Sequence, residues 1–154
     1  MTPWKAARAF PPSTRMNIGH AVAELEKRHR GEVRFVVEAE LTTGQLWRDV
    51  GSRARAIALF AQLGVWDTAE NTGVLVYVLL ADQKVEIVAD RGISGSVAQA
   101  QWQAICRAMQ ESFRAGRFEE GAIAGVAAIS ALLERHFPAR EDNANELPDQ
   151  PVML

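Results

Sequence analysis

The chain has 154 residues with a formal net charge of −2, and 48% of the residues are apolar while 23% are charged. This length and balance fit one globular domain with its own hydrophobic core. The near-neutral charge argues against a general nucleic-acid binder, which would carry a strongly basic face.

The cysteine content and the hydropathy of the chain favour a cytoplasmic protein. The single cysteine, Cys106, rules out an internal disulfide, and a reducing compartment suits the sequence. We recognise neither a secretory signal nor an apolar run of the roughly 20 residues that a membrane span requires. We therefore expect a cytoplasmic protein without a transmembrane segment, for which peripheral association with a membrane stays open.

The first thirty residues are expected to hold an irregular segment followed by a helix. Residues 1–16 are basic and contain the sequence FPPST, so we interpret them as a basic N-terminal arm. Ile18, Val22 and Leu25 then recur at helical spacing, which predicts a helix over residues 17–30.

The middle of the chain predicts a small mixed sheet. Residues 32–40 alternate between apolar and polar side chains, as in a strand, and residues 46–63 follow with helical spacing. Residues 73–80 are apolar throughout, as in a central strand, and residues 84–90 return after a short turn. We expect a parallel crossover from the first strand to the second, and then an antiparallel hairpin.

Two helices and a polar tail complete the predicted outline. The first helix ends at Gly116, and the second ends at Pro138 and has Gly121 and Gly125 spaced for close approach of another element. The acidic tail, residues 139–154, is expected either to be disordered or to pack on the sheet. Residues 17–138 should therefore form a three-layer α/β/α sandwich, in which about four helices flank the small mixed sheet.

The register of the predicted hairpin decides which polar residues meet. If Asp82–Gln83 is a two-residue turn, Leu75 opposes Asp90 and Gly73 opposes Gly92. The segments before the first hairpin strand and after the second then share one edge of the sheet.

Four oxygen-bearing side chains and one arginine flank this hairpin. Asp67, Glu70, Asn71 and Asp90 offer only oxygen ligands, which suit a hard cation such as Ca²⁺ or Mg²⁺. Arg91 offers a planar donor group for a phosphate or a carboxylate. The alternative interpretation is structural, with loop and cap residues and an ion pair of Arg91 with Asp90 or Glu70.

Several motifs of the sequence resemble the TPM domain family, which is named partly for a thylakoid lumen protein and a photosystem II repair factor. They include W-D-T-x-E-N-x-G-V-L-V-Y, K-V-E-I-V-A-D-R-G-I, F-R-A-G-R-F-E-E-G and L-L-E-R-H-F-P, at residues 66–77, 84–93, 113–121 and 132–138. The tail motif N-E-L-P-D, at residues 145–149, is similar to that of a short, cytoplasmic-type subgroup.

The resemblance implies an α/β/α sandwich and a divalent-cation site, often for calcium, in loops at one edge of the sheet. Some members of the family are described as phosphatases, and many are membrane-anchored or exported. This chain departs from the family at Thr72, which separates the usual Asn and Gly, and at Asp90 and Arg91, where many members are glycine-rich.

Two functional hypotheses follow. In the first, the chain is a non-catalytic module that binds a divalent cation or a partner and assists assembly or maintenance of a membrane-protein complex. In the alternative, it is a metal-dependent phosphomonoester hydrolase that acts on a small phosphorylated substrate. Asp67, Glu70 and Asp90 would then hold Ca²⁺ or Mg²⁺, Arg91 would hold the phosphate, and Glu70 would serve as a base.

Overall fold

The computed structural model describes residues 3–48, 50–140 and 145–154. The helices within these ranges are α1 (Pro3–Ala9), α2 (Pro12–Glu26), α3 (Thr43–Trp47), α4 (Ser52–Gln62), α5 (Arg91–Ser94), α6 (Gln99–Arg114) and α7 (Phe118–His136). The strands are β1 (Glu32–Glu38), β2 (Gly73–Leu79), β3 (Lys84–Ala89) and β4 (Val152–Met153).

The strands form one mixed sheet in the order β3-β2-β1-β4. Strand β1 runs parallel to both β2 and β4, and β3 pairs with β2 in the antiparallel direction. The predicted parallel crossover and the predicted hairpin are therefore both confirmed.

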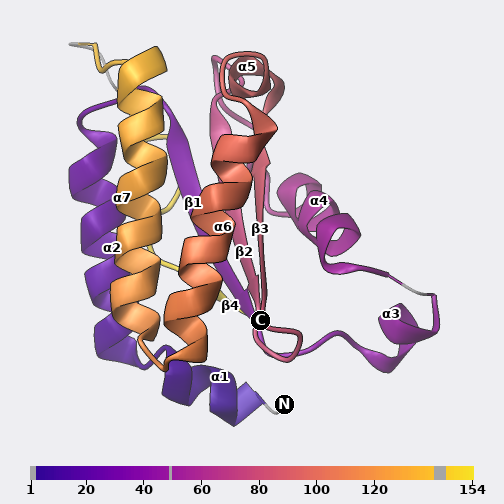
Figure 1. The fold of residues 1–154 in the computed structure, drawn as a ribbon. Coiled ribbons are helices and arrows are strands. Elements are labelled where there is room, and N and C mark those ends of the chain that lie inside the picture. The colour runs from indigo at the N-terminus through magenta and orange to yellow at the C-terminus, as the bar shows by residue number, and fades with distance from the viewer. Residues whose placement is uncertain (1–2, 49, 141–144) are drawn as a thin grey trace.

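The sheet lies between two layers of helices, as the sequence pattern predicts. Helices α2, α6 and α7 lie on one side of the sheet, and α4 lies on the other (Figure 1). Val33 and Phe35 of β1 belong to the core on the α2–α6–α7 side, whereas the intervening Val36 belongs to the core on the α4 side. This alternation is the period-2 pattern of a strand that is covered on both faces.

The predicted register of the hairpin is wrong by two residues. Leu75 pairs with Val88, and Leu79 pairs with Lys84, so the turn spans residues 80–83 rather than two residues. Gln83 closes the turn in the left-handed region, with a φ of 52°. Because side chains alternate with a period of two, this shift leaves every side chain on its predicted face.

The expectation of an irregular arm at the N-terminus is wrong for the described residues of that segment. Helix α1 spans most of it, and α2 begins at Pro12, where a proline fits the first turn because its missing N–H would be unpaired there anyway. The ring of Phe10 between the two helices is fully buried and contacts the rings of Phe35, Phe113 and Phe118.

The helix predicted over residues 46–63 is interrupted. Thr42 caps the short helix α3, because its Oγ1 accepts a hydrogen bond from the Gln45 N–H at 3.2 Å and Gln45 Oε1 accepts from the Thr42 N–H at 2.8 Å. Gly51 then begins α4. Helix α3 projects away from the rest of the molecule (Figure 1).

The two glycines of α7 allow the close approach of α6 that their spacing predicts. A Cβ atom on Gly121 would lie 2.6 Å from the Ser112 Cβ, and one on Gly125 would lie 2.3 Å from the Met109 Sδ. Both distances are shorter than a van der Waals contact. The α6–α7 interface therefore depends on the absence of side chains at these two positions.

The sequence left open whether the tail is disordered or packs on the sheet. Residues 145–154 pack along the sheet. The Arg34 guanidinium donates to the carbonyl oxygens of Pro148 at 3.0 Å and Gln150 at 2.7 Å. Leu154 exchanges backbone hydrogen bonds with Val37 and Ala39 beyond the two residues of β4. Within the described ranges, we find no helix that is both long enough and apolar enough to cross a membrane.

Candidate functional site

The two ends of the hairpin meet at one edge of the sheet, as predicted. The Asp90 N–H donates to the Gly73 carbonyl at 2.9 Å, and the Gly92 N–H donates to the Asn71 carbonyl at 2.9 Å. Asn71 has a φ of 56°, a conformation that asparagine tolerates better than most residues. A Cβ atom on Gly92 would lie within 2.5 Å of the carbonyl oxygens of Glu70 and Asn71, so only glycine fits this contact.

Glu70 lies between two arginines rather than in an open hollow. Its Oε2 accepts from Arg30 at 3.0 Å, and its Oε1 accepts from Arg140 at 2.9 Å. Arg30 also donates to the Pro138 carbonyl at 3.0 Å and stacks on the Phe137 ring. Glu70 thus connects the loop before β2 with the α2–β1 turn and with the segment after α7.

The other predicted residues of this site do not converge on one point. The Asp90 Oδ1 accepts from the Arg91 N–H at 2.7 Å and caps α5. Asp67 and Arg91 are exposed, and Asn71 is half-buried. The Asp90 Oδ1 and the Asn71 carbonyl therefore serve the backbone at this junction, whereas the Asp90 Oδ2 is buried and accepts no hydrogen bond from the described residues. The Asp67 N–H donates to the Gly64 carbonyl.

We tested whether these residues fit the divalent cation that the family resemblance implies. Among the described residues, no group of three or more His, Cys, Asp or Glu side chains has the arrangement of a metal site. Both carboxylate oxygens of Glu70, one of the predicted ligands, are bound by arginine. The residues as arranged do not fit Ca²⁺ or Mg²⁺, and cation binding stays a prediction.

A second acidic cluster lies at the same end of the sheet, beneath the tail. Glu26 is 7% exposed and Glu32 is 2% exposed. The Glu26 Oε2 accepts from the Val33 N–H at 2.8 Å, and the Glu32 Oε1 accepts from the Glu146 N–H at 2.7 Å. The carboxyl groups of Glu32 and Asp149 are close enough to the Glu26 carboxyl group to raise its pKa.

The environment of this cluster favours the protonated form of its carboxyl groups, because it raises their pKa values. Burial, together with the neighbouring carboxyl groups of Glu32 and Asp149, raises the pKa of Glu26 to about 11. Burial also raises the pKa of Glu32. The Glu26 Oε1, the Glu32 Oε2 and the Asp149 Oδ1 are all buried and make no hydrogen bond with the described residues, so a proton on the cluster would reduce the cost of burying three carboxyl groups together.

Our sequence-based prediction missed this cluster, although the sequence carried a signal for it. Ile18, Val22 and Glu26 follow one another at intervals of four, which places the glutamate on the apolar stripe of α2. An acidic residue on such a stripe is buried and needs a partner. The partners come from β1 and from the tail, which are distant in sequence.

His29 is a third buried titratable group in this region. It is fully buried, and burial lowers its pKa to about 4. Its Nδ1 accepts from the Gly31 N–H at 3.1 Å, and its Nε2 lies 3.3 Å from the Ser130 Oγ. The Gly31 contact requires an unprotonated Nδ1, so His29 is neutral and supports the α2–β1 turn.

Two solved structures are similar to this fold. The structure of the BA42 protein from the psychrophilic bacterium Bizionia argentinensis has a TM-score of 0.79 and 27% sequence identity, over 92% of this chain and 93% of that one. The N-terminal domain of a protein from P. gingivalis has a TM-score of 0.67 and 20% identity, over 82% of this chain and 77% of that one. The second likeness concerns the fold alone.

Comparison of the sequence with curated proteins gives no match. The sequence matches the TPM domain over residues 5–132, which is most of the chain. The match includes the motifs at residues 66–77, 84–93 and 113–121 that carry the family resemblance. The chain belongs to the TPM domain family.

Proposed function

We propose that this chain is a non-catalytic interaction module. The observation that carries the proposal is that Arg30 and Arg140 bind the two carboxylate oxygens of Glu70. A carboxylate held in this way joins three segments of the chain, and both of its oxygens already serve ion pairs instead of a cation. A metal-dependent hydrolytic site would instead require convergent carboxylate oxygens that are free to bind the metal ion or to take up a proton.

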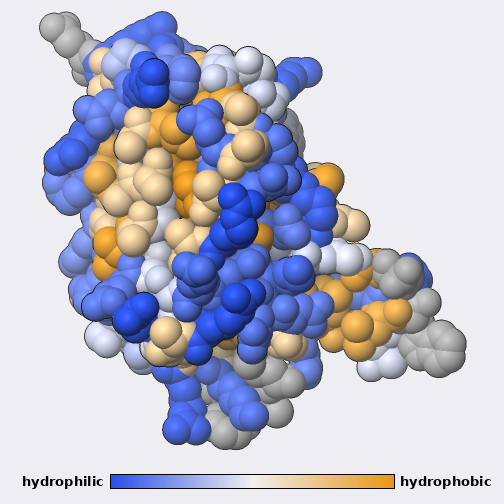
Figure 2. Space-filling view, viewed as in Figure 1, coloured by the Kyte–Doolittle hydropathy of each residue, from blue (hydrophilic) through white to orange (hydrophobic). Residues whose placement is uncertain are grey.

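Exposed apolar side chains support a binding role. Leu46 is 62% exposed, Ile57 is 51% exposed and Trp66 is 55% exposed, and all three belong to the segment that includes α3 and α4. Figure 2 shows apolar surface on the part of the molecule that projects at α3. Leu46 lies on the projecting helix α3, Ile57 lies on α4 and Trp66 follows α4. Exposed large apolar side chains are a common feature of protein interaction surfaces. As the class of partner we retain the membrane-protein complex of our first hypothesis.

A paired titration and activity assay tests the proposal. Chelator-treated protein is titrated with CaCl₂ and with MgCl₂ in a calorimeter, and the same samples are assayed for release of phosphate from p-nitrophenyl phosphate. Asp90→Asn and Glu70→Gln are measured in parallel. We expect no saturable heat and no phosphate release above a buffer blank in any sample.

Two results would overturn the proposal. Saturable binding that disappears in Asp90→Asn would restore the predicted cation site at the end of the hairpin. Cation-dependent phosphate release that Glu70→Gln abolishes would establish the hydrolase. Activity that survives in both variants would point to a contaminating phosphatase in the preparation, which a repeat after a further chromatography step would remove.

A further inference from the structure

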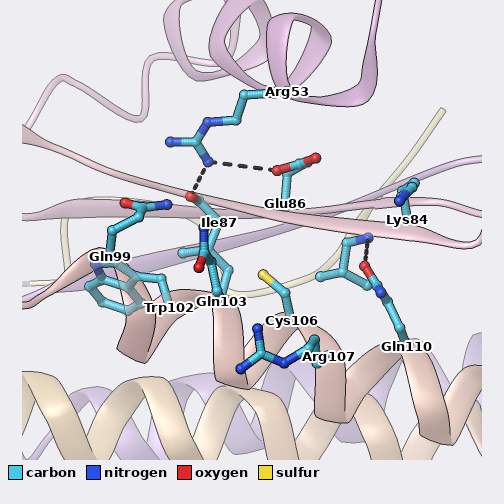
Figure 3. A pocket seen from close by; sticks show the side chains of 11 residues that line it. Arg53, Lys84, Glu86, Ile87, Gln99, Trp102, Gln103, Cys106, Arg107 and Gln110 are labelled. Atoms are coloured by element: carbon cyan, nitrogen blue, oxygen red, sulfur yellow. Dashed lines mark hydrogen bonds and ion pairs between the residues drawn. The ribbon is translucent and has the colours of Figure 1, made fainter.

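A hollow of about 400 Å³ lies beside β3, between α4 and α6 (Figure 3). Strand β3 forms one edge of the sheet, since it pairs only with β2 among the described strands. The hollow therefore follows a sheet edge, with one helix on each side of it. We call it the β3 groove, and it is distinct from the junction at the end of the hairpin.

The backbone of β3 that faces this groove is bonded by side chains instead of by a neighbouring strand. The Val85 N–H donates to the Gln110 Oε1 of α6 at 3.0 Å, and the Ile87 carbonyl accepts from the Arg53 guanidinium of α4. Figure 3 shows the two contacts on the same strand, reached from opposite sides. Asp90 bonds to β2 at the end of the strand, so by alternation Val85 and Ile87 turn their backbone groups outward.

These two contacts reproduce the hydrogen bonds that an added strand would make. The Gln110 side chain supplies an amide carbonyl, and Arg53 supplies an N–H, to residues two positions apart on one edge. An extended peptide presents a carbonyl and an N–H with this periodicity. Exposed sheet edges bind peptides in this way, and the main-chain bonds supply affinity that depends little on sequence.

The charges around the groove select the class of peptide. Arg53, Lys84 and Arg107 contribute three cations to its lining, against the single carboxylate of Glu86. Glu86 is already held by the Ser52 hydroxyl at 2.7 Å and lies 3.8 Å from Arg53. Lys84 and Arg107 are exposed at the rim, so the groove presents a net positive charge.

We propose that the β3 groove binds an extended acidic segment of a partner protein, which adds to the sheet beside β3. The Gln110 and Arg53 side chains leave the strand when the segment binds, and Arg53 then becomes available to an acidic side chain of the segment. This inference rests on the proposed interaction function and names the surface and the chemistry of the partner.

Selection from a library of random linear peptides displayed on phage tests this inference. The library is first depleted on Lys84→Glu/Arg107→Glu protein and then selected on the wild type. The control is Arg28→Glu/Arg135→Glu, which makes the same change of charge at exposed positions outside the groove. We expect acidic sequences to be enriched on the wild type and to bind the control equally well.

Synthetic copies of the enriched peptides then locate the site. We expect the peptides to bind the Lys84→Glu/Arg107→Glu protein about tenfold more weakly, because the two substitutions replace both ion pairs at the rim of the groove by repulsive contacts. Gln110→Ala removes a competing side chain and should tighten binding about fivefold. In heteronuclear NMR spectra, the amide signals of Val85 and Ile87 should shift during the titration.

The inference fails if no acidic sequence is enriched, or if the enriched peptides bind the Lys84→Glu/Arg107→Glu protein as tightly as the wild type. It also fails if peptide binding moves amide signals elsewhere but leaves Val85 and Ile87 unchanged. In that last case the proposed interaction function would still hold, but at another surface. Cation-dependent phosphatase activity would instead refute the proposed function and would not bear on peptide binding in the β3 groove.

Discussion

Replacing Glu26 by glutamine should stabilise the protein at neutral pH. The folded state keeps the Glu26 proton, because its pKa is raised from 4.5 to about 11, whereas the unfolded chain releases that proton above pH 4.5. The stability of the wild type therefore falls as the pH rises from 4.5 towards 11. At pH 7 the difference amounts to about 3 kcal/mol, at about 1.4 kcal/mol for each pH unit.

Glutamine retains the contacts of the protonated glutamate without this cost. Its carbonyl can accept from the Val33 N–H, and its amide can donate to Glu32 or Asp149. We expect Glu26→Gln to raise the free energy of unfolding by about 3 kcal/mol at pH 7 and to leave it nearly unchanged at pH 4.

Urea unfolding followed by circular dichroism at several pH values measures this effect. Glu24→Gln is the matched control, since Glu24 lies on the exposed face of the same helix and forms an exposed ion pair with Lys27 at 2.9 Å. Glu24→Gln should change the stability little at either pH. The reasoning is refuted if Glu26→Gln is no more stable than the wild type at pH 7, or if it gains as much at pH 4.

Three further predictions concern other buried groups. The pKa of His29 is lowered from 6.5 to about 4, so the unfolded chain takes up a proton at this residue below pH 6.5 while the folded protein does not. The free energy of unfolding should therefore fall by about 3 kcal/mol between pH 6.5 and pH 4. In acid unfolding curves, His29→Gln should remove this fall. Arg55→Met removes the ion pair of the buried Glu38 carboxylate and should lower the free energy of unfolding in urea by about 3 kcal/mol. Arg117→Met removes an exposed ion pair with Glu120 and should lower it by no more than about 0.5 kcal/mol. Equal losses in the two variants would contradict this prediction. Gly125→Ala places a Cβ atom against Met109 and should lower the unfolding free energy by about 2 kcal/mol, and an unchanged melting temperature would show that α6 can move aside.

The fold could be predicted from the sequence where short-range patterns carry the signal. The alternation in β1 and the apolar run of β2 identified the central strands, and the glycines of α7 identified the helix contact. The hairpin register could not be found in this way, because a turn of four residues and a turn of two keep the same faces inward. The helix predicted over residues 17–30 is confirmed in α2, whereas α1 and the start of α2 were missed because the basic residues and prolines there obscure the burial of Phe10.

The candidate site shows the limit of reasoning from residue types. The sequence correctly predicted that the two ends of the hairpin meet, and the structure confirms that Asp90 and Asn71 lie at the same edge of the sheet. It did not reveal the partners of Glu70, since Arg30 and Arg140 lie 40 and 70 positions away. The role of a carboxylate depends on which cations reach it, and distant segments of the chain supply them.

The most direct test of the central claim is a double-mutant cycle between Arg30 and Glu70. The free energy of unfolding is measured for the wild type, Arg30→Gln, Glu70→Gln and the double variant, each with and without millimolar CaCl₂. Because Arg30 is 19% exposed and Glu70 is 37% exposed, the pair is only partly screened, and we predict a favourable coupling of about 0.5–1 kcal/mol that calcium does not alter. No coupling between the two residues, together with stabilisation of the wild type by calcium that is lost in Glu70→Gln, would contradict the account.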